Sequence, residues 1–428
     1  MFFRFAFGLL MAIEAVRYVA SGWIRSYYLD VAYLFKYMGF EWVEPLSHPA
    51  MVVLFCVLTL AGLAVAVGLF YRAAMLILLV GNLYVFLLDA THYLNHIYLL
   101  LLLLTLMIFI PADRAASLDV RLRPGRARPT VPSWPRMLLV AQISIVYVYG
   151  GIAKLNADWI AGRPIRNWLI LAVREAPWRA EIITAPWFAE IIVWGGIAFD
   201  LGIVPLLLWR RTRALAVVAS FGFHLTNAYL FNIGVFPWAM LMATTLYFEP
   251  SWPRRIPVVG SWFGSLIDRG QAEPGPVRPF GGAWLMAAWL GVQVLLPLRH
   301  HLYPGDVAWT EEGHYFSWRM KLRSKSGVVR FELTDPATGE RWVVHPRDEL
   351  THRQTAKMAA KPDLILQYAH HLAAKHAKER GGPVEVRVDA KVALNYHPKR
   401  RLIDPEVDLV QVRPSLAPSD WILRYESD

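Results

Sequence analysis

The chain has 428 residues, of which 56% are hydrophobic and 18% are charged, and its formal net charge is +11. Charged residues make up roughly 25% of a typical soluble protein, so this composition excludes a disordered chain and an ordinary cytosolic protein. The single cysteine, Cys56, excludes an intrachain disulfide and a cysteine-rich metal site.

The charge is distributed unevenly along the chain. Residues 1–298 contain 38 charged side chains, whereas the much shorter segment 299–428 contains 39. We therefore expect a polytopic transmembrane domain over 1–298 and a water-soluble domain over 299–428. The arginine runs of the first part lie between apolar stretches and no basic–aromatic recognition motif accompanies them, so we expect a lipid bilayer and no nucleic acid as partner.

Nine apolar stretches approach the roughly 20 residues that a helix needs to cross a bilayer. They cover residues 3–23, 50–70, 72–88, 97–111, 136–153, 188–209, 214–228, 235–249 and 283–298. The first stretch contains Glu14 and Arg17 and is not followed by a small-residue cleavage site, so it is interpreted as a membrane helix and not as a signal peptide. The stretches 214–228 and 235–249 could also form one broken helix. The expected fold class is thus a mainly α-helical membrane bundle of eight or nine transmembrane helices.

Arginine-rich connections predict how the bundle is oriented. Cationic loops are retained on the cytoplasmic side, and the connections 112–135, 210–213 and 250–282 all lie there if the N-terminus is cytoplasmic. The segment 299–428 is then extracytoplasmic. The somewhat basic segment 154–187 is the exception, because it lies outside in this arrangement.

The soluble segment is expected to be a small α+β or β-sandwich-like domain. Short alternating runs predict strands at 316–322, 328–333, 341–345, 384–388 and 392–394. The sequence 335–339 is typical of a hairpin turn, and 362–379 has helical spacing with a proline at its start.

Lys154 follows the apolar stretch 136–153. Only two of the 23 basic residues in 1–298 are lysines, Lys36 and Lys154. A buried lysine that has lost its proton is a competent general base. Lys154 could equally be an anchor whose amine reaches the membrane surface beside Asp158.

Two further segments place polar side chains at membrane depth. Residues 89–96 include Asp89, Tyr93, Asn95 and two histidines, and 223–238 include His224 and Asn227 before a Gly and a Pro that permit a helix break. His92 and His96 could share a helix face and bind a metal, but no carboxylate–histidine spacing elsewhere completes such a site, so no metal is expected. Packing residues or a simple helix–helix turn would explain both segments as well.

Taken together, these runs resemble the vitamin K-dependent γ-glutamyl carboxylase family in a bacterial form with an HTTM-type membrane domain. The resemblance is carried by residues 89–96, 153–159, 223–236, 309–320 and 403–408. Each run alone is weak, but their order, their spacing and the change from membrane to soluble sequence are specific together.

The resemblance implies an enzyme of the carbon–carbon lyase class. Reduced vitamin K is oxygenated from the hydroquinone to the 2,3-epoxide, and this reaction is coupled to carboxylation of a protein glutamate with O2 and CO2. On this analogy Lys154 is the base that deprotonates the hydroquinone. Asn95 and His96 match positions near the quinone and the carboxylation step.

The resemblance also implies where substrates bind. The expected quinone- or substrate-binding residues are Asp89, Tyr93, His224, Asn227, Trp309 and Trp318. The co-substrate is phylloquinol or menaquinol, which partitions into the bilayer, and the partner is a Glu-containing peptide or protein. The expected location is a bacterial inner or plasma membrane.

This chain departs from the animal enzymes of the family. It is much shorter, it cannot form their disulfide, and Ala153 stands where they have a second lysine. A quinol epoxidase without protein carboxylation and a non-enzymatic membrane scaffold or transporter therefore remain as alternatives.

Overall fold

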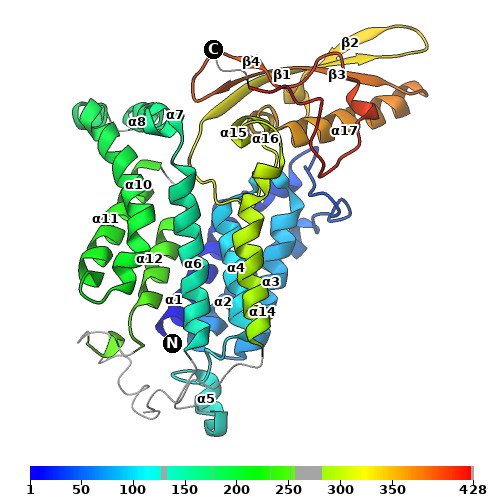
Figure 1. Ribbon diagram of the computed structural model, residues 1–428. Helices are drawn as coiled ribbons and strands as arrows, with labels where there is room; N and C mark the ends of the chain where they lie inside the picture. Colours follow the sequence, from blue (N-terminus) through cyan, green and yellow to red (C-terminus); the bar gives the residue numbers. More distant parts are fainter. Residues whose placement is uncertain (127–132, 176, 232, 251, 256–281, 426–428) are drawn as a thin grey trace.

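The structure is a computed structural model that describes residues 1–126, 133–175, 177–231, 233–250, 252–255 and 282–425. Long helices form one bundle, and a small sheet with its own helix covers one end of it (Figure 1). This arrangement confirms the predicted fold class.

The bundle is built from apolar helices that lie close to the predicted spans. They are α1 (Phe2–Ala20), α2 (His48–Val67), α3 (Tyr71–Leu88), α4 (Asn95–Phe109), α6 (Trp134–Ala153), α10 (Pro186–Leu208), α11 (Arg213–Phe231), α12 (Phe236–Thr244) and α14 (Ala283–Leu295). Among the described residues, α2, α3, α6, α10 and α11 are long and apolar enough to cross a membrane. The stretches 214–228 and 235–249 form two helices, α11 and α12, and not one broken helix.

Short helices connect the bundle at its two ends. They are α5 (Leu118–Leu122), α7 (Ala157–Ile160), α8 (Arg163–Glu175) and α9 (Ala180–Ile183). The side chain of Asn156 caps α7 by accepting a hydrogen bond from the Trp159 backbone N–H.

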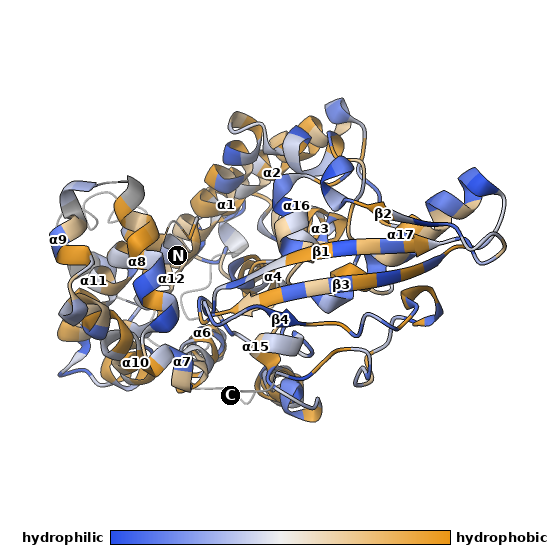
Figure 2. Ribbon diagram, turned by 90° about the horizontal axis from the view of Figure 1, so that it is seen from above, coloured by the Kyte–Doolittle hydropathy of each residue, from blue (hydrophilic) through white to orange (hydrophobic). Residues whose placement is uncertain are grey.

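The soluble domain contains one antiparallel sheet with the strand order β2-β1-β3-β4. Its strands are β1 (Lys325–Thr334), β2 (Arg341–Val344), β3 (Glu385–Leu394) and β4 (Arg400–Arg401), and Phe331 of β1 lies opposite Val388 of β3. Figure 2 shows hydrophilic and hydrophobic residues alternating along β1 and β3. The buried side chains of these strands pack on α17 (Pro362–Arg380), so the domain is α+β and the described residues hold no second sheet that would make a sandwich.

Two details of the predicted soluble domain are wrong. The runs 384–388 and 392–394 belong to a single strand, β3. The run 316–322 is not a strand, because Phe316, Trp318 and Lys321 have φ values of 63°, 58° and 47° in the left-handed region. Its apolar and polar residues alternate because neighbouring side chains pack on different helices of the bundle, as described below.

Hydrogen bonds between side chains and backbone fix the soluble domain on the bundle. Gln354 of α16 (His352–Met358) donates to the Tyr33 carbonyl at 2.7 Å and to Asp89 Oδ2 at 3.3 Å. Asn395, after β3, donates to Asp158 Oδ2 at 2.6 Å. The end of the bundle that carries residues 89–96 and Lys154 therefore meets the soluble domain.

Candidate active site

Lys154 ends α6 and turns its amine into the bundle. Lys154 is 8% exposed and Asp200 of α10 is 6% exposed, and the amine forms an ion pair with Asp200 Oδ2. The amine also lies 3.4 Å from the Gly150 carbonyl and 5.5 Å from the centre of the Trp159 ring. A buried lysine thus meets a buried carboxylate between two apolar helices.

Glycines make room for this pair. A Cβ at Gly150 would lie 3.2 Å from Asp200 Oδ2, and a Cβ at Gly196 would lie 3.6 Å from Lys154 Cε. Because Gly150 has no side chain, the Asp200 carboxylate can lie against α6 and meet the Lys154 amine inside the contact. At Gly196 the lysine stem packs at an ordinary van der Waals distance. The sequence prediction did not include Asp200, although a carboxylate inside an apolar helix is a signal that can be found without a structure.

A second polar group lies deeper along α6. The Tyr147 hydroxyl and His224 Nε2 are 2.9 Å apart, and both side chains are buried. Tyr147 precedes Lys154 by seven residues, which corresponds to about 10.5 Å along a helix. His224 Nδ1 is buried and has no hydrogen-bond partner in the part of the chain that the structure describes.

His96 faces the beginning of α12. A Cβ at Gly234 would lie 3.9 Å from His96 Nε2, and the Phe236 ring lies 6.1 Å from the His96 ring and 6.4 Å from the His224 ring. Phe236 therefore lies between the two histidines that the sequence singled out.

Asn95 and Tyr93 lie where the soluble domain meets α4. The Tyr93 hydroxyl donates to Asn95 Oδ1 at 2.9 Å and accepts a hydrogen bond from the Phe316 backbone N–H at 2.7 Å. These contacts join the start of α4 to the segment 313–322, which we call the roof segment.

The roof segment inserts side chains into the bundle. The Trp318 ring is fully buried and stacks on Tyr98 of α4 with a centroid distance of 5.0 Å. Its indole Nε1 has no hydrogen-bond partner among the described residues. The Met320 methyl lies 3.9 Å from where a Gly150 Cβ would be. The amine of Lys321 lies over the rings of Trp168 and Phe231. The segment thus reaches from α4 to the Lys154 end of α6.

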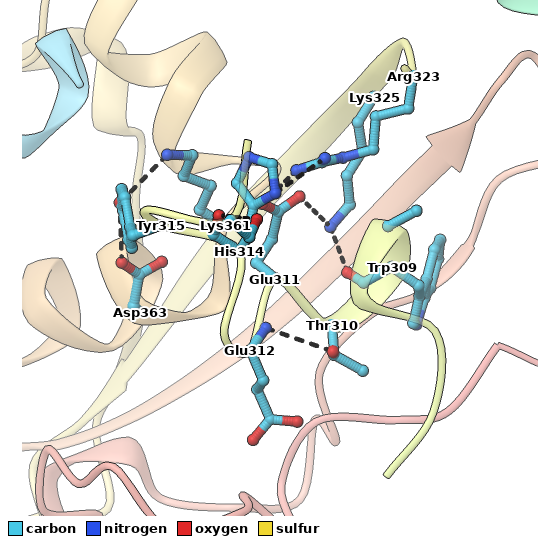
Figure 3. Close-up of polar contacts among 12 residues, drawn as sticks. Trp309, Thr310, Glu311, Glu312, His314, Tyr315, Arg323, Lys325, Lys361 and Asp363 are labelled. Atoms are coloured by element: carbon cyan, nitrogen blue, oxygen red, sulfur yellow. Dashed lines mark hydrogen bonds and ion pairs between the residues drawn. The ribbon is translucent and has the colours of Figure 1, made fainter. Parts of the chain in front are cut away.

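A buried charged cluster holds both ends of this segment (Figure 3). Glu311 forms ion pairs with Arg323 and with Lys325, and the Lys325 amine also donates to the Trp309 carbonyl. Burial alone would raise the pKa of Glu311, but Arg323 and Lys325 hold it well below its usual value. Burial lowers the pKa of Lys325 to about 8. Both cations are paired directly with Glu311, so removing this carboxylate would leave two buried charges without their partner.

Three of the predicted site residues lie apart from this group. Trp309 is buried in the core of the soluble domain, where its Nε1 donates to the Leu423 carbonyl at 2.7 Å. Asp89 accepts a hydrogen bond from the Thr91 backbone N–H at 2.8 Å and contacts Gln354, so it shapes the turn before α4. Asn227 is half-buried on α11, one turn beyond His224.

His92 and His96 do not share a helix face. His92 lies in a short 3-10 turn and its ring stacks near Tyr27 at 4.3 Å, whereas His96 lies in α4. His92 lines a cavity of about 40 Å³ that Glu14 and Asn82 also line. Within the part of the chain that the structure describes, no three His, Cys, Asp or Glu side chains are grouped so that they would hold a metal ion.

Two family models match this chain. The family model of the HTTM domain matches residues 1–252, and that of the vitamin K-dependent gamma-carboxylase lumenal domain matches residues 282–428. The chain belongs to the vitamin K-dependent gamma-carboxylase family. No solved structure matches it.

Membership in the gamma-carboxylase family indicates a vitamin K-dependent, carboxylase-like function in general. The family acts on glutamate-containing substrates. The apolar helices and the HTTM domain indicate an integral membrane protein. The family implies vitamin K hydroquinone as cofactor, and the bundle offers groups that fit it. His224 Nδ1 and Trp318 Nε1 are buried and have no hydrogen-bond partner among the described residues, so each can bond to an oxygen of the hydroquinone.

Proposed function

We propose that this protein oxygenates vitamin K hydroquinone to its epoxide and couples that reaction to carboxylation of a protein glutamate. The observation that carries the proposal is the buried Lys154–Asp200 pair beneath the roof segment. When bound, vitamin K hydroquinone supplies, on reaction with O2, the strong base that removes a γ-proton from glutamate before CO2 adds.

Lys154 is proposed as the general base. Its amine takes the proton of a hydroquinone hydroxyl, a role that arginine cannot fill because its guanidinium stays protonated. Burial between α6 and α10 keeps bulk water from the amine, which supports proton transfer to it and protects reactive species from quenching.

Trp318 and His224 are proposed to hold the hydroquinone. Each has one buried ring nitrogen without a partner in the described residues, and a bound hydroxyl or carbonyl oxygen would satisfy it. Asn95 and His96 are proposed to act near the carboxylation step, because the roof segment binds Tyr93, which in turn binds Asn95. Asp89, Asn227 and Trp309 would support the site from further away.

The glutamate is proposed to arrive on a peptide outside the membrane. The soluble domain carries an open groove of about 510 Å³ between α17 and the start of β3, lined by residues that include His370, Ala377 and Val384. With a cytoplasmic N-terminus in a bacterial plasma membrane, this groove faces the extracytoplasmic side.

The proposal is tested with purified protein in detergent. The protein is incubated with vitamin K hydroquinone, O2, bicarbonate and a Glu-containing peptide, and both the quinone and the peptide are analysed by mass. We expect the quinone epoxide together with a peptide gain of about 44 mass units that is lost in acid, as CO2 addition to a carbon atom requires. Epoxide without peptide modification would identify a quinol epoxidase, and no epoxide would leave a membrane scaffold or transporter.

A further inference from the structure

We infer that Asp200 is the positioning residue for Lys154: its carboxylate orients the amine and stabilises the cation that forms when the amine takes a proton. This inference rests on the function proposed above. Asp200 lies well inside α10 and contacts Lys154 Nζ through Oδ2.

The two carboxylates of α10, Glu190 and Asp200, differ in their position along the helix and in their burial. Glu190 lies near the start of α10 and forms an exposed ion pair with Arg166. Asp200 lies among apolar residues, where an ionised group is costly unless it is paired. A carboxylate at this depth therefore needs Lys154, and a buried lysine cation needs the carboxylate.

The surroundings of the pair restrict its geometry. Gly150 and Gly196 leave space that the carboxylate oxygen and the lysine stem fill, and the Trp159 ring covers the amine. Trp159 is itself fixed by its Nε1 bond to the Val193 carbonyl at 3.3 Å. An amine that is held from several sides can present one direction to a substrate.

Proton transfer shows what the carboxylate contributes. The step starts from the neutral amine, so the Lys154 ammonium of the ion pair first releases one proton to water. The hydroxyl O–H bond of the substrate then breaks, an N–H bond forms at Lys154 Nζ, and the electron pair of the broken bond stays on the oxygen. The new ammonium lies against the Asp200 carboxylate, so the cation is not left unpaired in apolar surroundings. Asp200 acts on the substrate only through Lys154, as the third member of a catalytic triad acts through its base.

The test compares Asp200→Asn, Asp200→Glu, Lys154→Ala and the double variant Lys154→Ala/Asp200→Asn in the full-length protein. We expect Asp200→Asn to lower kcat for epoxidation about 10²-fold, at the low end of the range for loss of a general base, while KM for the hydroquinone stays within about twofold. Asp200→Glu should retain part of the epoxidation rate that Asp200→Asn loses, because it keeps a carboxylate. The double variant should be no slower than Lys154→Ala alone, because Asp200 has nothing left to position.

Glu14→Gln is the matched control, because Glu14 is another carboxylate inside an apolar helix and is paired with Arg17. It should leave kcat within about twofold of the wild-type value. Wild-type kcat in Asp200→Asn, or a further loss in the double variant, would overturn the inference.

A stability measurement separates this inference from the proposed function. Lys154→Ala and Asp200→Asn should each lower Tm because each leaves a buried partner without its opposite charge, and the double variant should recover much of that loss. If the wild-type protein forms no epoxide but this coupling in Tm is present, the proposed function fails and the pairing of the two residues stands. Additive losses in Tm would overturn the pairing itself.

Discussion

Two ring nitrogens, His224 Nδ1 and Trp318 Nε1, are among the buried polar atoms that have no hydrogen-bond partner in the described residues. Buried polar groups in folded proteins almost always have a hydrogen-bond partner, so each such group requires a reason. Both rings lie on aromatic neighbours, Phe236 for His224 and Tyr98 for Trp318. A ligand that combines an aromatic face with polar edges meets both requirements.

Trp318→Phe tests the ligand role of the indole N–H. The variant keeps an aromatic ring on Tyr98 and removes only the polar atom and part of the ring. Loss of one hydrogen bond to a ligand is worth about 1 kcal/mol, so we expect KM for the hydroquinone to rise about fivefold. Tm should also fall, because a buried ring becomes smaller. Steady-state epoxidation kinetics and a thermal melt measure the two effects.

Trp309→Phe serves as the control for Trp318→Phe. It removes the bond to the Leu423 carbonyl in the soluble core, so it should lower Tm and leave KM unchanged. An unchanged KM in Trp318→Phe would show that its N–H does not contact the hydroquinone.

The sequence singles out candidate site residues but not the residues that they contact. Lys154, His96 and His224 stand out in the sequence because polar groups in apolar stretches are costly. Asp200 does not stand out as the partner of Lys154, since 46 residues separate them and only the packing of α6 against α10 brings them together. Trp309 and Trp318 lie nine positions apart, yet one packs in the soluble core and the other in the bundle.

At the scale of elements, α1 and α2 cross so closely that no side chain fits at Gly8 or Gly62. A Cβ at Gly62 would lie 2.7 Å from the Ala12 backbone nitrogen, and one at Gly8 would lie 2.4 Å from the Ala66 nitrogen. Small residues at such a crossing let helix backbones pack directly in a membrane.

Gly62→Ala should therefore separate α1 from α2. The added methyl group meets backbone and not a flexible side chain, so we expect a loss of about 1–3 kcal/mol in stability, seen as a lower Tm in detergent. Gly222→Ala in α11 is the matched control, because a Cβ there meets nothing within 4 Å. Equal Tm values for the two variants would contradict the close crossing.

The charged cluster around Glu311 is the element that holds the roof segment to the soluble domain. Glu311→Gln leaves Arg323 and Lys325 without a carboxylate in a buried site. We expect a loss of about 3 kcal/mol, measured as a fall in Tm. Glu332→Gln removes a carboxylate from an exposed ion pair with Arg330 and should change stability by less than about 0.5 kcal/mol.

The same cluster gives stability a defined dependence on pH. The pKa of Glu311 is lower in the folded protein than its ordinary value of 4.5. A lowered carboxylate pKa contributes stability that is present above pH 4.5 and is lost as pH falls toward the folded-state pKa. Glu311→Gln should therefore show a smaller loss of Tm than wild type on acidification below pH 4.5.

Helices with a regular pattern of apolar residues were predicted well. A segment whose side chains pack on two different parts of the protein was not. Helix α3 matches its predicted range because it is one continuous, largely apolar stretch. Helix α17 matches because its spacing is helical, a proline stands at its start and Gly381 follows its end. The roof segment was predicted as a strand because its apolar residues alternate. Its side chains alternate because they pack on two different neighbours: Trp318 packs on α4, and Lys321 packs where α8 and α11 meet. No strand in the described residues pairs with it.

For the molecule as a whole, the two chain ends lie at opposite ends of the bundle (Figure 1). The arginine-rich connections predict a cytoplasmic N-terminal end, and on this prediction the soluble domain is extracytoplasmic. A phosphatase that is active only outside the cytoplasm, fused after Asp428, should be active in cells. A cytoplasm-specific fluorescent reporter at the same place should stay dark, and the reverse pattern would show the opposite orientation.

Lys154 carries the central claim, because the soluble domain, the roof segment and Asp200 all meet at its end of α6. The direct measurement is the rate of vitamin K hydroquinone epoxidation by Lys154→Arg. Arginine keeps the positive charge but cannot give up its proton, so we expect a loss of about 10²–10⁴-fold with folding and quinone binding retained. Lys36→Arg, which changes the other lysine of residues 1–298, should keep the wild-type rate.

Lys154→Ala should lose the rate in the same way and regain part of it when a small amine is added, because the amine can occupy the vacated space and take the proton. Near-normal epoxidation by Lys154→Arg would contradict the account and show that Lys154 is an anchoring residue.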